Sequence, residues 1–357
     1  MLYNKESIDR VIAAFKKGDI VIVTDDDSRE NEGDLIVAAE FCTTEKMAFI
    51  IRYTSGIICT PMPLYWANKL SLPPMVENNS SAYHTAFTVS VDYKEGTTTG
   101  ISAYERALTA RKLSDNSTKS EEFVRPGHIF PLTARNGGLL ERSGHTEAAV
   151  DLCKLAGLSP VAVIGELMND DGTVQHGQQI DAFAAKYNIL KVTIEDLITY
   201  RQVTEKLVHE ITVSEYVING VNTSHYRYDI GKRGVIYNVL KIGSVNFNDA
   251  YIYIGNSEPT VGDIDLLLKK YGAVIYIWAA ISNECDRGAF GSDNERHTQA
   301  LQRSEIWCNY MAIAQILKDL SICCGNIVSD HSESVMDLYK NIFLLYYISI
   351  RSHNHND

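Results

Sequence analysis

Residues 20–39, IVIVTDDDSRENEGDLIVAA, contain the pattern that decides the fold. Its two apolar runs, 20–24 and 35–39, have the length and composition of buried strands, and a charged segment joins them. Upstream, apolar residues from Ile8 to Phe15 recur at the spacing of one helix face. A helix that feeds buried strands is typical of a mixed α/β fold.

The same mixture of signals continues to about residue 204. Helical patterns occupy 44–56, 146–157 and 193–202, and extended patterns occupy 86–92 and 160–168. We therefore predict an α/β domain over residues 1–204.

Composition excludes several classes of protein. With 45% apolar and 22% charged residues, the 357-residue chain is not generally disordered. Its 45 acidic and 33 basic residues give a net charge of -12, which makes nucleic acid an improbable partner. No run approaches the roughly 18 apolar residues of a membrane span, and residues 1–10 resemble no secretory signal. We expect a cytoplasmic protein.

A change in composition predicts a second domain. Seven of the 8 prolines precede residue 204, whereas 12 of the 20 tyrosines follow it. The boundary is placed within 201–206, which gives domains 1–204 and 205–357. The second part has extended runs at 234–245, 250–255 and 273–280, and helical spacing at 263–272 and 309–321. It is predicted to be another α/β unit.

The charged segment between the two predicted strands is unusually acidic. Its carboxylates are Asp25, Asp26, Asp27, Glu30, Glu32 and Asp34. A solvated turn is one interpretation. The alternative is a site, because strands at both ends hold the carboxylates in place. A divalent cation, Arg29, or a raised pKa of one carboxyl would relieve their repulsion, and the last of these creates a usable acid or base.

A second candidate segment is Arg142–Thr146, RSGHT, which immediately precedes a helical pattern. A helix start binds anions, Gly144 permits close approach, and Arg142 supplies a guanidinium fork, so a phosphate would fit. In the alternative interpretation Thr146 only caps the helix and His145 is a loop histidine. Paired with a carboxylate of the acidic segment, His145 would suit Mn²⁺ or Mg²⁺.

Other residues are ambiguous from spacing alone. Glu166 falls within an apolar run and is either an exposed strand end or functional. His128 stands between two prolines and reads better as structural. The 7 cysteines are scattered without a CxxC pair, which disfavours disulfides and thiolate zinc sites. Most are expected to be small buried residues.

Seven long segments together resemble 3,4-dihydroxy-2-butanone 4-phosphate synthase of riboflavin biosynthesis. They are DDDSRENEGDLIVAAE, SGIICTPM, LPPMVENNSSAYHTAFTVSVDYKEGTTTGISAYERA, FVRPGHIFPL, NGGLLERSGHTEAAVDLCKLAG, ELMNDDGT and TIEDLITYRQ. The resemblance covers residues 1–204 and implies that family's mixed-sheet α/β fold. It also implies conversion of ribulose 5-phosphate to a four-carbon phosphate and formate with Mg²⁺, or Mn²⁺, by a homodimer.

The resemblance also assigns roles. It makes Glu30 and His145 metal ligands, and His128 and Glu166 essential to catalysis, which reverses the structural interpretation of His128. Asp34 joins them as a candidate proton carrier. The residues implied to contact or line the substrate pocket are Arg29, Glu30, Asp34, Cys59, Thr99, Arg142, Ser143, Gly144, His145, Thr146 and Glu166.

Residues 205–357 resemble a decayed GTP cyclohydrolase II. That family binds zinc through a cysteine and a nearby Cys-x-Cys pair, whereas the corresponding stretch 245–272 contains no cysteine. We therefore expect no zinc and no catalysis by this half. Two alternatives stay open: a bifunctional enzyme that also hydrolyses GTP, and a binding or scaffold protein that does not use its motifs.

Overall fold

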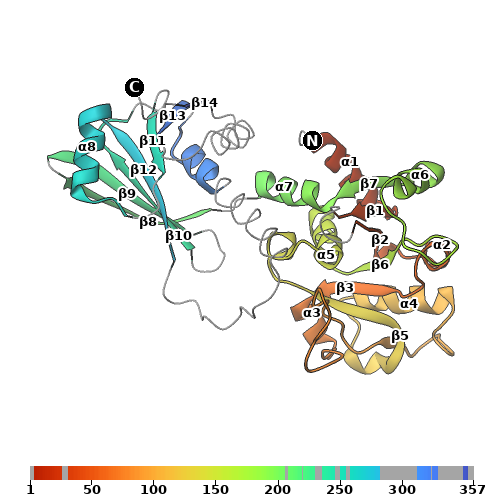
Figure 1. The fold of residues 1–357 in the computed structure, drawn as a ribbon. Coiled ribbons are helices and arrows are strands. Elements are labelled where there is room, and N and C mark those ends of the chain that lie inside the picture. Colours follow the sequence, from red (N-terminus) through yellow and green to blue (C-terminus); the bar gives the residue numbers. More distant parts are fainter. Residues whose placement is uncertain are drawn as a thin grey trace. The chain divides into compact units, whose positions relative to one another are not determined.

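The computed structural model describes residues 4–25, 31–205, 208–218, 220–229, 235–245, 250–254, 258–281, 312–322, 324–328 and 349–352. The chain forms two compact units, Met1–Arg201 and Gln202–Asp357 (Figure 1). Each consists of a sheet with helices, so the predicted α/β class is confirmed. Within the ranges given above, no helix is both long and apolar enough to cross a bilayer.

The described part of the first unit contains a seven-stranded mixed sheet with the order β4-β5-β3-β6-β2-β1-β7. Its strands are β1 (Val21–Thr24), β2 (Gly33–Ala38), β3 (Cys59–Pro63), β4 (Val91–Tyr93), β5 (Phe123–Ala134), β6 (Ala162–Glu166) and β7 (Leu190–Thr193). The β3–β5 and β1–β7 pairs are parallel, and the other neighbouring pairs are antiparallel. The two apolar runs that flank the acidic segment are thus adjacent antiparallel strands.

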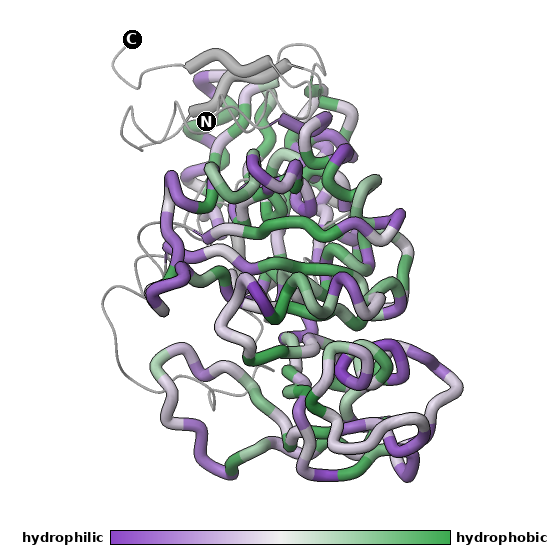
Figure 2. The backbone as a smooth tube through the Cα atoms, turned by 90° about the vertical axis from the view of Figure 1, so that its right-hand side faces the viewer, coloured by the Kyte–Doolittle hydropathy of each residue, from purple (hydrophilic) through white to green (hydrophobic). Residues whose placement is uncertain are grey.

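Helices cover both faces of this sheet. They are α1 (Lys5–Lys16), α2 (Thr44–Tyr53), α3 (Leu64–Lys69), α4 (Ala103–Ser114), α5 (His145–Ala156), α6 (Gln178–Tyr187) and α7 (Ile194–Thr204), with short 3₁₀ turns at Ala39–Phe41, Ser120–Glu122 and Gly138–Leu140. Hydrophobic and hydrophilic positions alternate along the tube (Figure 2), and α1, α2 and α6 are amphipathic helices.

Alternation along the strands divides the core in two. Val21 and Val23 of β1 belong to a cluster with α1, α5 and α7, whereas Ile22 belongs to a cluster with α2, α3, α4 and α6. Successive strand residues point to opposite faces, so a fully apolar strand indicates a sheet covered on both sides. β2 divides in the same way, with Ile36 on the α5 face and Leu35 on the other.

The first predicted helix is present and buries Ile8, Val11 and Phe15. Its N-cap is Asn4, whose side-chain oxygen accepts a hydrogen bond from the Ser7 N–H at 3.2 Å. This bond satisfies one of the donors that a helix start leaves unpaired.

The described part of the second unit contains another seven-stranded sheet, ordered β14-β13-β11-β12-β10-β9-β8. Its elements are β8 (His209–Ile218), β9 (Val221–Asp229), β10 (Val235–Ile242), β11 (Ala250–Ile254), α8 (Val261–Tyr271), β12 (Val274–Ile281), β13 (Cys324–Val328) and β14 (Ser349–Ser352). α8 packs on one face, with Ile264 and Leu267 in its cluster, and a helix at 312–319 contributes Ile316 and Leu317 to the other. Of the later cysteines, Cys285, Cys308 and Cys323 lie outside the described residues.

Candidate active site

Strand register brings two predicted catalytic carboxylates together. Asp34 of β2 lies directly opposite Glu166 of β6. Cα atoms of such antiparallel partners are about 4.5–5.5 Å apart, and their side chains share a face. Cys59 of β3 lies opposite Ile164, two residues before Glu166, so its side chain is on that face as well. Neighbouring strands therefore gather Asp34, Glu166 and Cys59.

The two carboxylates contribute to a raised pKa of the nearby Cys59 thiol. Burial, and to a smaller extent the negative charges of Asp34 and Glu166, raise the pKa of Cys59 to about 12. Cys59 is 8% exposed. The thiol is therefore protonated at neutral pH and is not a nucleophile.

We expect Cys59 to resist alkylation in the folded protein. At pH 8 a pKa of about 12 leaves about one thiol in 10⁴ ionised, against roughly a quarter of ordinary thiols. Iodoacetamide treatment followed by peptide mass spectrometry checks this, with glutathione in the same tube as reactive control and urea-unfolded protein as accessible control. Complete labelling of folded Cys59 within minutes would contradict it.

The segment Arg142–Thr146 forms the start of α5. His145 is the first helical residue, and the N-cap is Gly144, which makes no side-chain capping bond. The interpretation of Thr146 as the cap is therefore wrong, because the N-cap lies two residues earlier, at Gly144. The free end of a helix with a glycine cap presents backbone N–H groups to an anion. His145 and Thr146 are buried, whereas Ser143 is exposed.

The position of α5 follows from its connection to the sheet. Ala148, Ala149 and Leu152 pack on the sheet face that includes Cys59 and Ile164. A short connection then leads from α5 into β6, so the two elements run in opposite directions. The N-terminus of α5 consequently lies toward the end of β6 that bears Glu166.

Arg142 is held in place beside this helix start. Its Nη1 donates to Oε2 of Glu147 at 2.6 Å, and its Nη2 donates to the Tyr83 carbonyl at 3.2 Å. Burial raises the pKa of Glu147, and Arg142 opposes this shift. A Cβ atom at Gly144 would come within 2.3 Å of Nη1 of Arg142, so a larger residue there would displace this guanidinium. Sequence reasoning did not identify Glu147, although its place in the first helical turn after Arg142 was a signal.

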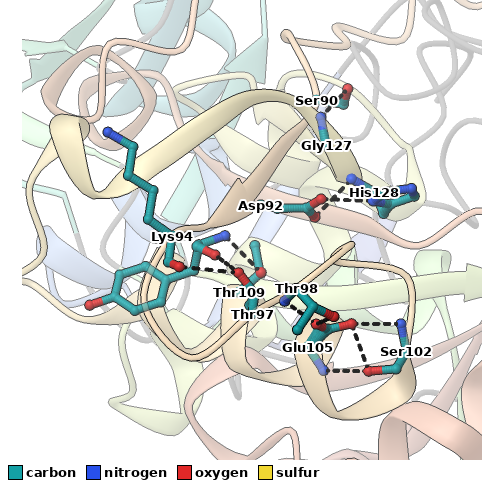
Figure 3. A network of polar contacts seen from close by, with 11 residues as sticks. Ser90, Asp92, Lys94, Thr97, Thr98, Ser102, Glu105, Thr109, Gly127 and His128 are labelled. Carbon is teal, nitrogen blue, oxygen red and sulfur yellow. Dashed lines mark hydrogen bonds and ion pairs between the residues drawn. The ribbon is translucent and has the colours of Figure 1, made fainter.

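His128, on β5, is oriented by a residue that sequence reasoning missed. Asp92 of β4 accepts the His128 backbone N–H at 2.8 Å, and its other oxygen lies 2.7 Å from Nδ1 of the ring (Figure 3). Asp92 is 5% exposed. A carboxylate that binds one ring nitrogen leaves the other directed away for proton transfer, which is how active sites orient a histidine. Ser90 holds the same strand by accepting the Gly127 N–H at 3.1 Å.

The loop that contains Thr99 is fixed by Glu105 of α4. Thr98 donates its backbone N–H and, at 2.7 Å, its hydroxyl to Glu105, which also accepts from Ser102 (Figure 3). These bonds, first of all those from Thr98, lower the pKa of Glu105 to about 2. Thr99 itself is exposed, so its role in a pocket stays a prediction.

Gly100 leaves room for Asp92. With φ at +85°, its hypothetical Cβ would lie 2.0 Å from Oδ2 of Asp92. Replacing Gly100 with alanine is expected to displace Asp92 and His128 and to lower turnover by about 10²-fold. Gly96→Ala is the matched control, since Gly96 has a similar φ of +78° and meets only a leucine methyl at 3.3 Å. Equal losses in the two variants of a turnover assay would contradict the steric argument.

Not every predicted residue is brought together. His128 lies on β5, two strands from Glu166 on β6, which is about 10 Å at ordinary strand spacing. Arg29 and Glu30 lie outside the described residues.

The donor set can be compared with what Mg²⁺ requires. No group of three or more His, Cys, Asp or Glu side chains suited to a metal occurs among the residues described. Mg²⁺ needs no such group, because it keeps several waters and uses one or two protein ligands beside substrate oxygens. The buried imidazole of His145 with one carboxylate fits this mode of binding.

Comparisons with known proteins agree with the sequence motifs. The family model of 3,4-dihydroxy-2-butanone 4-phosphate synthase matches residues 9–200. The synthase of Saccharomyces cerevisiae is 53% identical over 201 residues, which are 54% of this chain and 97% of the relative. The chain spans about half the length of the riboflavin biosynthesis proteins of Oryza sativa and Bacillus cytotoxicus that it also matches.

Solved structures are similar as well. A 3,4-dihydroxy-2-butanone 4-phosphate synthase in complex with two magnesium ions is 48% identical, with a TM-score of 0.55, over 56% of this chain and 97% of its own. RibBX, a two-domain 3,4-dihydroxy-2-butanone 4-phosphate synthase from A. baumannii, is 30% identical, with a TM-score of 0.72, over 97% of this chain and 99% of its own.

Proposed function

The chain belongs to the 3,4-dihydroxy-2-butanone 4-phosphate synthase family, and from this premise we propose that it converts ribulose 5-phosphate to 3,4-dihydroxy-2-butanone 4-phosphate and formate. The observation that carries the proposal is the register of Asp34 opposite Glu166, beside the helix start at His145. The reaction removes a proton next to a ketone, loses water, rearranges the carbon skeleton and releases one carbon. Paired carboxylates supply proton carriers for such steps.

The roles proposed for the side chains follow their surroundings. Asp34, Glu166 and His128 move protons, and Asp92 holds the His128 ring for this purpose. Residues Arg142–Thr146 bind the phosphate through the helix start and the guanidinium. The other predicted contact residues are proposed to line the pocket around the sugar; they are Arg29, Glu30, Cys59 and Thr99.

Glu30 and His145 are proposed to hold a divalent cation, Mg²⁺ or Mn²⁺. A bound cation stabilises negative charge that develops on the sugar oxygens. The synthase structure with two magnesium ions supports a divalent metal in this family.

The two parts of the chain are proposed to differ in function. Residues 1–204 are the synthase domain, and residues 205–357 are a GTP cyclohydrolase II-like domain without zinc and without catalysis. Support comes from the stretch 245–272, which contains no cysteine, and from the similarity to a two-domain synthase. A cytoplasmic location stays a prediction of the sequence.

We also propose that the chain forms a homodimer. The first unit exposes large apolar side chains close to site segments: Ile57 is 55% exposed, and Ile101 and Tyr104 are each 52% exposed. Such residues are typical of an interface core. Light scattering coupled to gel filtration tests the proposal, and a monomer at micromolar concentration would contradict it.

The decisive experiment measures formate released from ribulose 5-phosphate by the full chain, with Mg²⁺ and with EDTA, beside a GTP assay supplied with zinc. Metal-dependent formate from the sugar and none from GTP is the expected result. Formate from GTP would show instead that the second domain is catalytic. No formate from either substrate would leave a binding or scaffold protein as the better account.

A further inference from the structure

Arg106 of α4 is a buried cation for which the proposed mechanism has no role. It is 7% exposed, and its Nη1 donates to the Gly56 carbonyl at 3.0 Å. Its Nε makes no hydrogen bond to any residue that the structure describes. A buried donor without a partner costs stability, so such a group requires an explanation other than the fold.

Asp92 of β4 is the acidic group whose charge acts on Arg106, and β4 packs on α4, where the Tyr93 N–H donates to the Thr109 hydroxyl at 3.0 Å. Burial lowers the pKa of Arg106, and the negative charge of Asp92 raises it in opposition. Asp92 in turn binds both the backbone and the ring of His128. Gly100 and Gly127 pack so closely on the Asp92 segment that a Cβ at either would overlap it, so Asp92 has little room to move.

The other contact of Arg106 leads toward Glu166. Gly56 belongs to the segment between α2 and β3, where Ser55 donates its N–H to the Glu166 carbonyl at 3.0 Å. On the far side of this segment, Ile58 accepts the N–H of Phe130, on the same strand as His128, at 3.0 Å. The segment 55–58 therefore bridges the strand of Glu166 and the strand of His128.

We propose that Arg106 is a positioning residue of the active site, which holds Asp92 by charge and the Gly56 segment by a hydrogen bond and thereby sets the placement of His128 relative to Glu166. The expected effect on kcat rests on the proposed function, whereas the expected effect on the placement of His128 does not. Arg106 itself touches neither substrate nor the reacting atoms.

The test compares Arg106→Met and Arg106→Lys with the wild-type full chain. Methionine removes both the charge and the hydrogen bond, and kcat is expected to fall by about 10- to 100-fold with KM changed less than about 2-fold, because misplacement harms the chemical step more than binding. Lysine keeps the positive charge but lacks the forked guanidinium that reaches the Gly56 carbonyl, and it is expected to give an intermediate loss of kcat.

A second readout is independent of activity. The His128 Nδ1–H that Asp92 binds gives a downfield proton resonance in NMR, assigned through a His128→Gln variant. In Arg106→Met this resonance is expected to shift or broaden, while in Arg106→Lys it is retained.

Arg111 provides the matched control, because it lies on the same helix and its Nη1 also donates to a backbone carbonyl, that of Cys42, at 2.6 Å. Arg111→Met removes the same number of charges and the same kind of bond without affecting Asp92. It is expected to leave kcat and the His128 resonance unchanged.

Three results would overturn the proposal: an unaltered His128 resonance in Arg106→Met, a kcat within about 2-fold of wild type, or an equal loss in Arg111→Met. If Arg106→Met does not fold, the lysine variant decides, since wild-type kcat there would exclude a positioning role. If the wild type releases no formate, the proposed function fails while the NMR comparison still tests the placement of His128.

Discussion

Replacing Glu166 with glutamine is expected to lower formate release from ribulose 5-phosphate by about 10²- to 10⁴-fold, the usual contribution of a positioned acid or base. Glutamine keeps the shape of the side chain but carries no exchangeable carboxyl proton. It also removes one of the two negative charges that face each other on β2 and β6. Steady-state kinetics at saturating Mg²⁺ measures the effect.

Glu195→Gln is the control for Glu166→Gln, because Glu195 is an exposed carboxylate in the first turn of α7. It is expected to retain wild-type turnover. Thermal unfolding of both variants should match that of the wild type, which would assign the loss in Glu166→Gln to chemistry. Turnover above half of the wild-type value in Glu166→Gln would remove Glu166 from the mechanism.

Replacing Arg201 with methionine is expected to lower the free energy of unfolding of the first unit by about 3–5 kcal/mol. The reason is that the buried carboxylate of Asp151 loses the cation that pairs with it. Asp151 is 1% exposed, and its Oδ2 accepts from Nη1 of Arg201 at 2.7 Å and from the Leu139 N–H at 2.8 Å. Nη1 of Arg201 also donates to the Gly137 carbonyl at 2.9 Å. Urea unfolding of the full chain, followed by fluorescence, gives the change.

Lys154→Met separates the buried pair from ordinary surface charge. Nζ of Lys154 lies 3.9 Å from Oδ1 of Asp151, but its side chain is 45% exposed. Because solvent screens such a pair, its removal is expected to cost less than about 1 kcal/mol. A cost for Arg201→Met as small as that for Lys154→Met would show that Asp151 is not dependent on its partner.

Local patterns predicted most elements of the first unit. The spacing of Ile8 and Phe15 indicated α1, and the apolar runs around the acidic segment indicated β1 and β2. These patterns succeed because burial on one helix face, or on both faces of a strand, requires apolar residues at regular spacings within one short stretch of sequence. The pairing of Asp34 with Glu166 was not predictable from spacing, since register between strands 132 residues apart depends on the whole sheet.

Asp92 and the β8–β9 hairpin show two ways in which a sequence signal is missed. In the alternating run 86–92, Asp92 falls on the polar phase, which suggests exposure, yet Gly100 and Gly127 pack on it and it binds His128. Asn219-Gly220 is a strong hairpin dipeptide between two extended runs and was a usable signal for β8 and β9. In contrast, burial of a polar residue such as Asp92 by a distant segment produces no pattern in the neighbouring sequence.

The row of strands that carries the candidate site also has a consequence for folding. His128, Cys59, Glu166 and Asp34 come from β5, β3, β6 and β2, which are neighbours in space but distant in the chain. Closing such long loops makes this topology slow to form. All four residues are in register only when these strands have paired, so we expect recovery of turnover during refolding to follow the slowest phase, after most helical signal has returned. The rate at which enzyme activity returns would then report the rate at which the strands of the sheet pair.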